Sequence, residues 1–393
     1  MRLLIITNYP FPYGLAQTNR LIAIARGLHH AGAEVEVVIS KATEVDYKRN
    51  NRATGNYHGI PFTYTTGATV RPARTWPRAV LFYRGLIGMY RHVIRANSQK
   101  KVDALFLGVY NNRITWMVYL LTRLLNIRFI QERSEYPFLS YTKGPAGRIK
   151  LGIYLKFICP RFDGFIVISR ALKEYFTPFL KHTPIYLLPI LVEPERFESG
   201  DVPVENVISY CGSMQGTKDG VPILIEAFAR IAPRFPGTKL RLIGTTDFLG
   251  FDRLKEKIRE LNLQERIVFT GMVERERMPL LLRQSKILAL ARPASKQAEG
   301  GFPTKLGEYL ASGRPVVVTP VGDIPDYLVH GETALLATPG DADDFAQKLA
   351  HVLSDEQSGE LIGQRGKKLA REVFHYRVRG VKLYDWLNGL IRS

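Results

Sequence analysis

Short apolar runs alternate with amphipathic stretches along most of the chain, which is the pattern of a wound α/β sheet. Residues 1–7 and 33–40 have the composition of strands. Between them, apolar residues recur at three- and four-residue spacing, which predicts a helix that ends near Gly32. The same pattern predicts further strands at residues 104–109, 127–131, 164–169, 207–212, 238–244, 266–271 and 286–292. Such alternation favours parallel sheets, which bind ligands at the carboxyl ends of their strands.

The alternation is interrupted at residues 189–206, where prolines and acidic side chains replace the basic composition of the preceding half. We interpret this segment as a linker. With 393 residues, of which 46% are hydrophobic, the chain exceeds one ordinary core and has the apolar content for two. We therefore predict an α/β protein with two Rossmann-like domains, each built on a parallel sheet and divided near residue 190.

The net charge of +19 is unevenly distributed along the chain. Residues 1–190 contain 27 Lys+Arg and 9 Asp+Glu, whereas the remainder contains 28 and 27. No acidic residue occurs within residues 47–102, where arginines are interleaved with aromatic residues that include Trp76, Phe82 and Tyr83. This mixture favours an anionic membrane surface, where each cation contributes about 1 kcal/mol. Nucleic acid would attract the same charge, and a solvated basic face without a partner is the plainer alternative.

Several classes of chemistry are excluded by the sequence. Cys159 and Cys211 are the only cysteines, so a disulfide framework and a four-cysteine metal site are ruled out, and a reducing compartment is expected. The eight histidines lack metal-ligand spacing, and neither a dinucleotide fingerprint, a P-loop nor a nucleophile elbow occurs. The apolar run at the N-terminus is too short for a signal peptide, and none reaches the roughly 18 residues of a membrane span. We therefore expect a soluble protein or one peripheral to a membrane.

Residues 300–319, GGFPTKLGEYLASGRPVVVT, place a lysine and a glutamate in a largely apolar segment. Pro303 favours the first turn of a helix and Gly313 its end, which predicts a helix of about ten residues that starts at 303. The free N–H groups of its first turn, the hydroxyl of Thr304 and the ammonium of Lys305 would together attract an anion such as a phosphate.

Glu308 lies five residues beyond the start of this predicted helix, or about 7.5 Å at the helical rise per residue. That distance corresponds to the reach from a diphosphate to the ribose of the same nucleotide. A carboxylate only accepts hydrogen bonds, so it suits the two ribose hydroxyls and repels phosphate. The segment therefore predicts a nucleotide site, with an ordinary surface helix carrying one basic and one acidic residue as the alternative.

The segment also resembles the donor motif of retaining glycosyltransferases of the GT-B fold, family four. Residues 210–220 are similar to the phosphate loop of that family, and residues 321–355 to the segment that follows its donor motif. Residues 162–176, the glycine loop at Gly14 and the last helices are similar to further parts of the same family. The resemblance therefore covers nearly the whole chain and implies two parallel sheets that face a central cleft.

The resemblance implies a role for each part of the chain. Residues 1–190 would bind the acceptor, residues 191–372 the nucleotide-sugar donor, and residues 373–393 would form helices that cross back to the first domain. Glu132 and Glu299 are the candidate catalytic carboxylates, although Glu132 could instead form a salt bridge to Arg133 or a neighbour. The implied nucleotide-binding residues are Gly212, Ser213, Lys218, Arg292, Thr304, Lys305 and Glu308. The implied sugar-binding residues are Gly300, Gly301, Phe302 and Pro303, and those on the acceptor side are Gly14 and Arg133.

The chain departs from the family pattern at two points in the donor half. The first glutamate of the family motif falls on Gly300, with Glu299 one place early. The arginine of the phosphate loop is replaced by Ser213, which removes a bidentate partner for phosphate. Arg292, at the end of a predicted strand, could restore that cation from another direction.

The resemblance implies a retaining glycosyltransferase that moves a sugar from a UDP- or GDP-linked donor to a lipid-linked or anionic saccharide. We expect no cofactor and no obligatory metal, a cytoplasmic location at the inner face of the cell membrane, and a role in cell-surface polysaccharide or glycolipid synthesis. No nucleic-acid partner is expected. A nucleotide-sugar epimerase of similar fold and a basic nucleic-acid-binding module are the alternatives.

Overall fold

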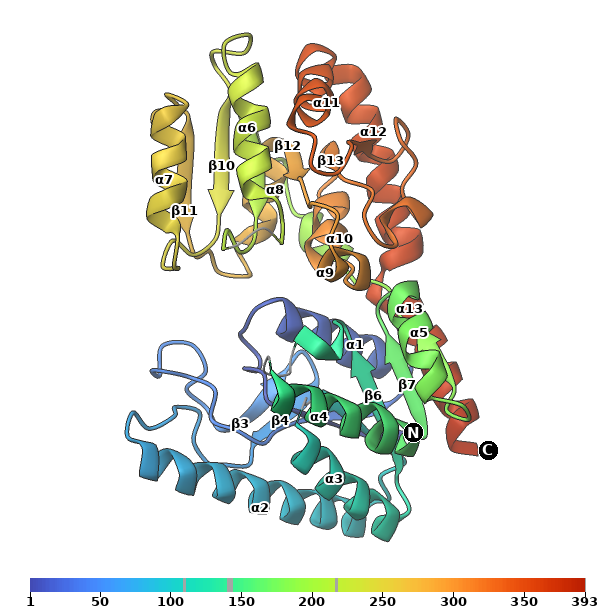
Figure 1. Cartoon of the computed structure of the whole chain (residues 1–393). Helices are drawn as coiled ribbons and strands as arrows, with labels where there is room; N and C mark the ends of the chain where they lie inside the picture. The colour runs from blue at the N-terminus through green and yellow to red at the C-terminus, as the bar shows by residue number, and fades with distance from the viewer. Residues whose placement is uncertain (109–110, 140–143, 216–217, 393) are drawn as a thin grey trace. The chain divides into compact units, whose positions relative to one another are not determined.

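The computed structural model describes residues 1–108, 111–139, 144–215 and 218–392. The chain divides into two compact units (Figure 1). Unit 1 comprises residues 1–191 together with residues 376–393, and unit 2 comprises residues 192–375.

Unit 1 contains an eight-stranded sheet in the order β3-β4-β2-β1-β5-β6-β7-β8. Its strands are β1 (Arg2–Thr7), β2 (Glu34–Ile39), β3 (Thr54–Tyr57), β4 (Ile60–Tyr64), β5 (Ala104–Gly108), β6 (Arg128–Arg133), β7 (Gly164–Val167) and β8 (Ile185–Leu187). All neighbouring strands run parallel except β3 and β4, which form an antiparallel hairpin at one edge. The five strands predicted in this half are confirmed, whereas β3, β4 and β8, which lie at or next to the edges of the sheet, were not predicted because strands of three to five residues carry a weak apolar pattern.

The helices of unit 1 pack on this sheet. They are α1 (Ala16–His30), α2 (Thr75–Gln99), α3 (Asn112–Leu125), α4 (Pro145–Ile153), α5 (Arg170–Phe176) and α13 (Tyr376–Arg392), with short turns η1 (Pro137–Leu139), η2 (Tyr154–Ile158), η3 (Cys159–Arg161) and η4 (Thr177–Phe179). Helix α13 follows unit 2 in sequence but packs on α1, where a Cβ atom at Gly380 would lie 2.3 Å from the carbonyl carbon of Gly27. Two helix backbones can approach so closely only because both positions are glycine.

Unit 2 contains a six-stranded parallel sheet in the order β11-β10-β9-β12-β13-β14. Its strands are β9 (Glu205–Cys211), β10 (Lys239–Ile243), β11 (Ile267–Gly271), β12 (Ser285–Leu290), β13 (Val316–Val318) and β14 (Leu335–Leu336). Its helices are α6 (Val221–Ile231), α7 (Phe251–Glu260), α8 (Met278–Gln284), α9 (Lys296–Gly300), α10 (Thr304–Ala311), α11 (Ala342–Ser354) and α12 (Glu356–Leu369), with short turns η5 (Pro194–Phe197), η6 (Ile324–Asp326) and η7 (Ala370–Phe374). The four strands predicted for residues 207–292 are confirmed.

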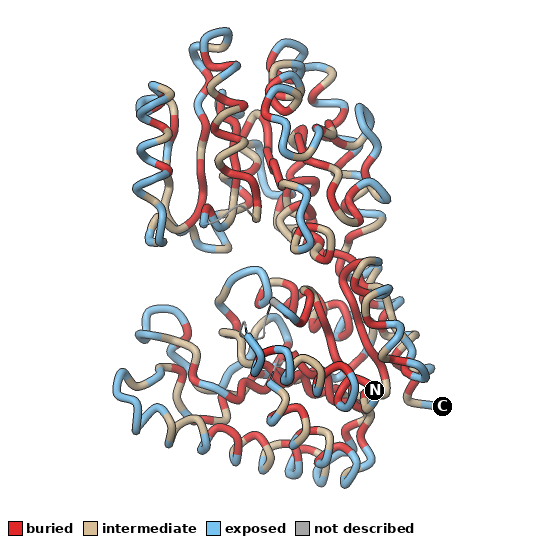
Figure 2. The backbone as a smooth tube through the Cα atoms, in the orientation of Figure 1, coloured by how far each residue is buried: buried red, intermediate tan, exposed pale blue. Residues whose placement is uncertain are grey.

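Burial follows the strands in each unit, while exposed positions gather on the outer sides of the helices (Figure 2). In the central strand β5 every residue is buried, and in β1 every residue after Arg2. Nearly continuous apolar strands of this kind are typical of parallel sheets covered on both faces. Among the helices of the described residues, none combines the length and the apolar character that crossing a membrane requires.

Candidate functional site

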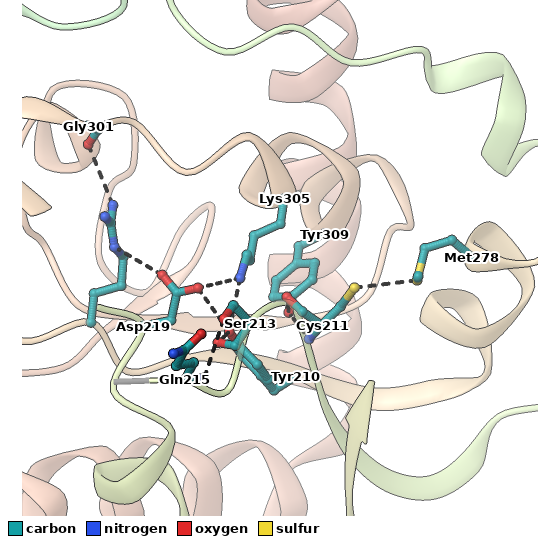
Figure 3. Close-up of polar contacts among 10 residues, drawn as sticks. Tyr210, Cys211, Ser213, Gln215, Asp219, Met278, Gly301, Lys305 and Tyr309 are labelled. Atoms are coloured by element: carbon teal, nitrogen blue, oxygen red, sulfur yellow. Dashed lines mark hydrogen bonds and ion pairs between the residues drawn. The ribbon is translucent and has the colours of Figure 1, made fainter. Parts of the chain in front are cut away.

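The candidate site of unit 2 lies at the carboxyl ends of two adjacent strands. β9 ends at Cys211 and leads into a loop at Gly212, and its neighbour β12 is followed by Arg292. Helix α10 is fastened to the end of β9, because the Cys211 N–H donates to the hydroxyl of Tyr309 at 2.6 Å (Figure 3). The topology therefore brings the end of β9 next to two segments that lie about 80 to 90 residues later in the chain, as expected for a ligand site of a parallel sheet.

Asp219 is the centre of a buried polar cluster at this edge (Figure 3). The ammonium of Lys305 lies 2.6 Å from its Oδ2 atom, and the hydroxyl of Tyr210 lies 2.8 Å from the same oxygen. Arg292, whose side chain is 1% exposed, places Nε 3.5 Å from the Oδ1 atom of Asp219. The cluster thus combines two cations and one carboxylate, which leaves it one positive charge in excess.

The carboxyl group of Asp219 is stabilised in its charged form. Burial by itself would raise the pKa of Asp219, but the charges of Lys305 and Arg292 and the hydrogen bonds from Lys305 and Tyr210 outweigh it and lower the pKa below 3.8. For Tyr210, burial first and then the charge of Asp219 raise the pKa well above 10. The tyrosine therefore stays a neutral hydrogen-bond donor at physiological pH.

We predict that Asp219 makes the stability of unit 2 depend on pH in acid. A carboxyl group whose pKa is lower in the folded than in the unfolded chain stabilises the fold above its unfolded pKa. That contribution is lost as the pH falls from 3.8 through the lowered value. The free energy of unfolding of Asp219→Asn, measured by urea denaturation, should approach that of the wild type as the solution is acidified. A difference in unfolding free energy between the two proteins that stays constant as the pH falls would contradict this prediction.

Glycine permits Lys305 to reach the cluster. Gly212 has φ 147°, and a Cβ atom there would lie 1.9 Å from the Lys305 ammonium nitrogen. Gly220, which precedes α6, has φ 68° and approaches the carbonyl oxygen of Ala291 so closely that a Cβ atom would lie 1.7 Å from it. Any side chain at Gly212 would therefore displace the ammonium from its place.

The start of α10 differs from its predicted position. The helix begins at Thr304, and Pro303 is its N-cap: its backbone is extended, with ψ 111°, while its carbonyl oxygen accepts from the N–H of Leu306 at 3.0 Å. Gly300 is not part of this helix start, since it is the last residue of the separate helix α9. The predicted helix is therefore present with its start displaced by one residue to Thr304, whereas the prediction that Gly300 belongs to its N-terminus is wrong.

The remaining candidate residues of unit 2 occupy different environments. Ser213 is exposed, while Lys218 and Gly301 are half-buried. Phe302 is buried against Tyr327 and Phe374, with ring centroids 5.4 and 5.8 Å away, so its side chain belongs to the core. Glu299 pairs with Lys296 at 2.8 Å at the surface, as a residue of the same helix.

Glu308 has an ionic partner that the sequence did not indicate. The Arg196 Nη1 atom donates to Glu308 Oε1 at 2.7 Å, and the two side chains are 16% and 20% exposed. Arg196 belongs to η5, more than a hundred residues earlier in the chain. Such a pair is invisible to periodicity, and its only sequence signal is an arginine in the acidic linker.

The candidate residues of unit 1 lie at the carboxyl end of β6. Glu132 Oε1 accepts from Arg20 Nε at 2.8 Å and from the hydroxyl of Ser134 at 2.6 Å, so its partner is Arg20 and not Arg133. Arg133 is buried, donates from Nε to the hydroxyl of Tyr154 at 2.8 Å and stacks on that ring. The two neighbouring residues therefore face different surroundings.

Glu132 borders a small pocket of unit 1. Arg20, Ser134, Gln17 and Tyr9 supply its other polar groups. Aliphatic residues and Phe106 supply the rest of the lining.

Gly14 is half-buried just before α1, where a Cβ atom would lie 2.1 Å from the hydroxyl of Thr18. Within the described residues, no group of three or more His, Cys, Asp and Glu side chains could hold a metal ion.

Part of unit 2 is similar in sequence to a family of known proteins. Residues 205–355 match the family described as glycosyl transferases group 1. The chain is 28% identical over 198 residues to a GDP-mannose-dependent alpha-(1-6)-phosphatidylinositol monomannoside mannosyltransferase of Mycolicibacterium smegmatis, a match that covers 50% of each protein. It is 26% identical over 213 residues to an MMP alpha-(1->4)-mannosyltransferase of Mycolicibacterium hassiacum, covering 54% of this chain and 50% of that protein. The chain thus spans about half the length of these curated relatives.

Solved structures match the chain over almost its whole length. Sucrose-phosphate synthase from Thermosynechococcus elongatus has a TM-score of 0.74 at 17% identity and covers 100% of this chain and 99% of its own. Anabaena Alr3699/HepE, solved in complex with UDP, has a TM-score of 0.73 at 16% identity and covers 99% of this chain and 100% of its own. At these identities the likeness shows the fold, and the predicted GT-B fold is confirmed.

Proposed function

We propose that this chain, whose residues 205–355 match the family of glycosyl transferases group 1 and which has the GT-B fold, is a retaining glycosyltransferase dependent on a nucleotide sugar. The observation that carries the proposal is the cluster at the carboxyl edge of the unit 2 sheet. There, Lys305 in the first turn of α10 and the buried Arg292 both pair with Asp219, and Glu308 lies one turn further along the same helix.

The cluster suits the departure of a nucleoside diphosphate. Negative charge develops on the diphosphate as the bond to the sugar breaks, and fixed donors and cations stabilise it most in a water-poor site. Lys305, Arg292 and the free N–H groups at the start of α10 would meet that charge, with Thr304 as a further donor. Glu308 would accept hydrogen bonds from the ribose hydroxyls. Glu132 and Glu299 both have ion-pair partners, so we assign no nucleophile.

We further propose that unit 1 receives an anionic or lipid-linked saccharide at a membrane surface. Helix α2 has three distinct faces. The exposed apolar face carries Trp76, Val80, Tyr83, Ile87 and Ile94 at helical spacing, and Trp76 is 78% exposed. A second face is buried and includes Leu86, Met89 and Val93. The exposed Arg84, Arg91 and Arg95 form a third face next to the apolar one, and apolar and basic faces side by side are typical of helices lying in a membrane interface.

The predicted interfacial role of one aromatic residue of α2 is wrong. Phe82 is half-buried and lies on the side of the helix that faces the protein, because it shares that side with Leu86 and Met89. Gly85 and Gly88 allow α2 to lie close to the residues that follow β2 and β4. A Cβ atom at Gly85 would lie 2.4 Å from the carbonyl oxygen of Ser40, and one at Gly88 would lie 2.4 Å from that of Thr65. Trp76 and Tyr83 remain the exposed aromatic residues of α2.

The direct test of the proposed function is incubation of the purified protein with a panel of UDP- and GDP-linked sugars. Mass spectrometry should detect consumption of one donor and release of its nucleoside diphosphate, and calorimetry should show that this nucleotide binds. The comparisons do not decide between a UDP-linked and a GDP-linked donor, because a sequence relative is named as GDP-mannose-dependent and a structural neighbour was solved with UDP. A folded protein that neither binds nor consumes any member of the panel would reject the proposal.

We predict that Glu308→Gln weakens binding of the preferred nucleoside diphosphate. The substitution keeps the shape but replaces one acceptor by a donor, which should cost about 1.5 to 3 kcal/mol for a charge-assisted hydrogen bond. Calorimetric titration measures this. Unchanged affinity in a folded variant would mean that Glu308 does not contact the ligand and serves only as the partner of Arg196.

A further inference from the structure

We propose that Arg196 is a positioning residue that fixes one oxygen of Glu308, so that the site distinguishes ribonucleotides from deoxyribonucleotides. This inference rests on the proposed function, in which Glu308 binds the ribose. It adds a residue from outside the donor motif, because Arg196 lies in η5 at the start of unit 2.

The contacts of Arg196 hold its guanidinium at two points. Nη1 donates to Glu308 Oε1 at 2.7 Å, and Nη2 donates to the carbonyl oxygen of Arg275. The guanidinium also lies 5.8 Å from the ring centroid of Phe197, which is fully buried. Because the guanidinium is anchored by backbone and ring as well as by Glu308, it orients the carboxylate rather than following it.

A second ion pair braces the same turn. Arg275 Nη2 lies 2.5 Å from Glu193 Oε1, and the Glu193 side chain is 4% exposed. Arg275 lies in the segment between β11 and α8, and Glu193 directly precedes η5. The turn that carries Arg196 is therefore tied to this segment through both Arg196 and Glu193, which limits the movement of the guanidinium.

The two carboxylate oxygens of Glu308 have different roles: one binds Arg196, and the other is left for the ligand. Within the described part of the chain, Oε1 carries the bond to Arg196 and Oε2 carries no hydrogen bond. An arginine only donates hydrogen bonds and keeps its charge at physiological pH, so it holds an acceptor in place without competing for the ligand's hydroxyl protons. A glutamate that is already ordered loses less conformational freedom on binding than a free one, which raises affinity.

The distinction between ribose and deoxyribose isolates this role. A site built to accept a hydroxyl proton rejects an analogue that lacks the hydroxyl, since the acceptor is then left without a partner. If Arg196 positions Glu308, its loss should weaken binding of the ribonucleotide and leave the deoxy analogue nearly unaffected. A residue that only supports the fold would weaken both ligands alike.

The experiment is calorimetric titration of the full chain with UDP, GDP and their 2′-deoxy and 3′-deoxy counterparts. We expect the wild type to prefer the ribonucleotide by about tenfold or more, and Arg196→Gln to lose most of that preference while its affinity for the deoxy forms is unchanged. Glu308→Gln and the double variant Arg196→Gln with Glu308→Gln should bind each nucleotide with the same affinity, because Arg196 acts only through Glu308. Arg241→Gln, which removes a partner of Glu205 at the beginning of β9, is the matched control and should keep the preference.

The outcomes separate this inference from the proposed function. A ribose preference that is lost in Glu308→Gln but kept in Arg196→Gln overturns the inference alone. Equal losses for ribo and deoxy forms in Arg196→Gln also overturn it and assign the residue to the scaffold. A wild type without any preference overturns the ribose role of Glu308 and the inference together. If Arg196→Gln fails to fold, Arg196→Lys carries the test and should retain part of the preference.

Discussion

Replacing Lys305 by methionine is expected to lower the affinity for the preferred nucleoside diphosphate by about 100-fold, the loss of a charge-assisted contact to the diphosphate. The affinity for the corresponding nucleoside, which has no phosphate, should change little. The same substitution removes the nearest cation of a buried carboxylate, since Asp219 lies 2.6 Å from the Lys305 ammonium. Breaking a buried pair in this way costs about 3 kcal/mol of unfolding free energy.

A second substitution separates the two effects of Lys305. In the double variant Lys305→Met with Asp219→Asn, no uncompensated carboxylate remains beside the methionine, so urea denaturation should show most of the lost stability restored. Arg292 then lacks its carboxylate partner, which limits the recovery. Calorimetry should show that diphosphate binding stays weak. A double variant that regains both stability and binding would mean that Lys305 supports the fold and does not contact the ligand.

Replacing Arg78, Arg84, Arg91 and Arg95 by glutamine is expected to release the protein from anionic vesicles. All four side chains are exposed on α2. At about 1 kcal/mol per cation near the headgroups, the four changes together should lower the partition coefficient by about 1000-fold. High salt should have a similar effect on the wild type, because exposed charges are screened beyond about 8 Å at physiological ionic strength. Sedimentation with phosphatidylserine-containing vesicles measures both.

A matched control tests whether charge alone or its location matters. Replacing four exposed basic residues of unit 2 by glutamine removes the same net charge, and these residues are Arg253, Lys255, Arg365 and Lys368. That variant should sediment like the wild type, and both variants should keep their affinity for the nucleotide. If the wild type fails to sediment at low salt, the membrane proposal is wrong, and a soluble anionic acceptor becomes the better explanation of the basic first half.

The regular elements around the site could be predicted from local patterns. The apolar runs at residues 207–212 and 286–292 became β9 and β12, because a strand buried on both faces needs nearly continuous apolar residues whatever surrounds it. The end of α10 near Gly313 followed from that glycine, which has φ 77°. The start of α10 was displaced by one residue, and α9 was not predicted, because short helices are decided by capping contacts such as the Ser295 side chain with the Ala298 N–H.

By itself the sequence determined the two parallel sheets, the α10 segment with Lys305 and Glu308 one turn apart, and the concentration of charge in the first half. These features depend on neighbours within a few residues. The partners of the charged groups follow from the three-dimensional fold, since Asp219 and Lys305 are 86 positions apart, and Arg196 and Glu308 are 112 apart. A buried charge must find a partner wherever the fold brings one near, and periodicity along the chain carries no information about that choice.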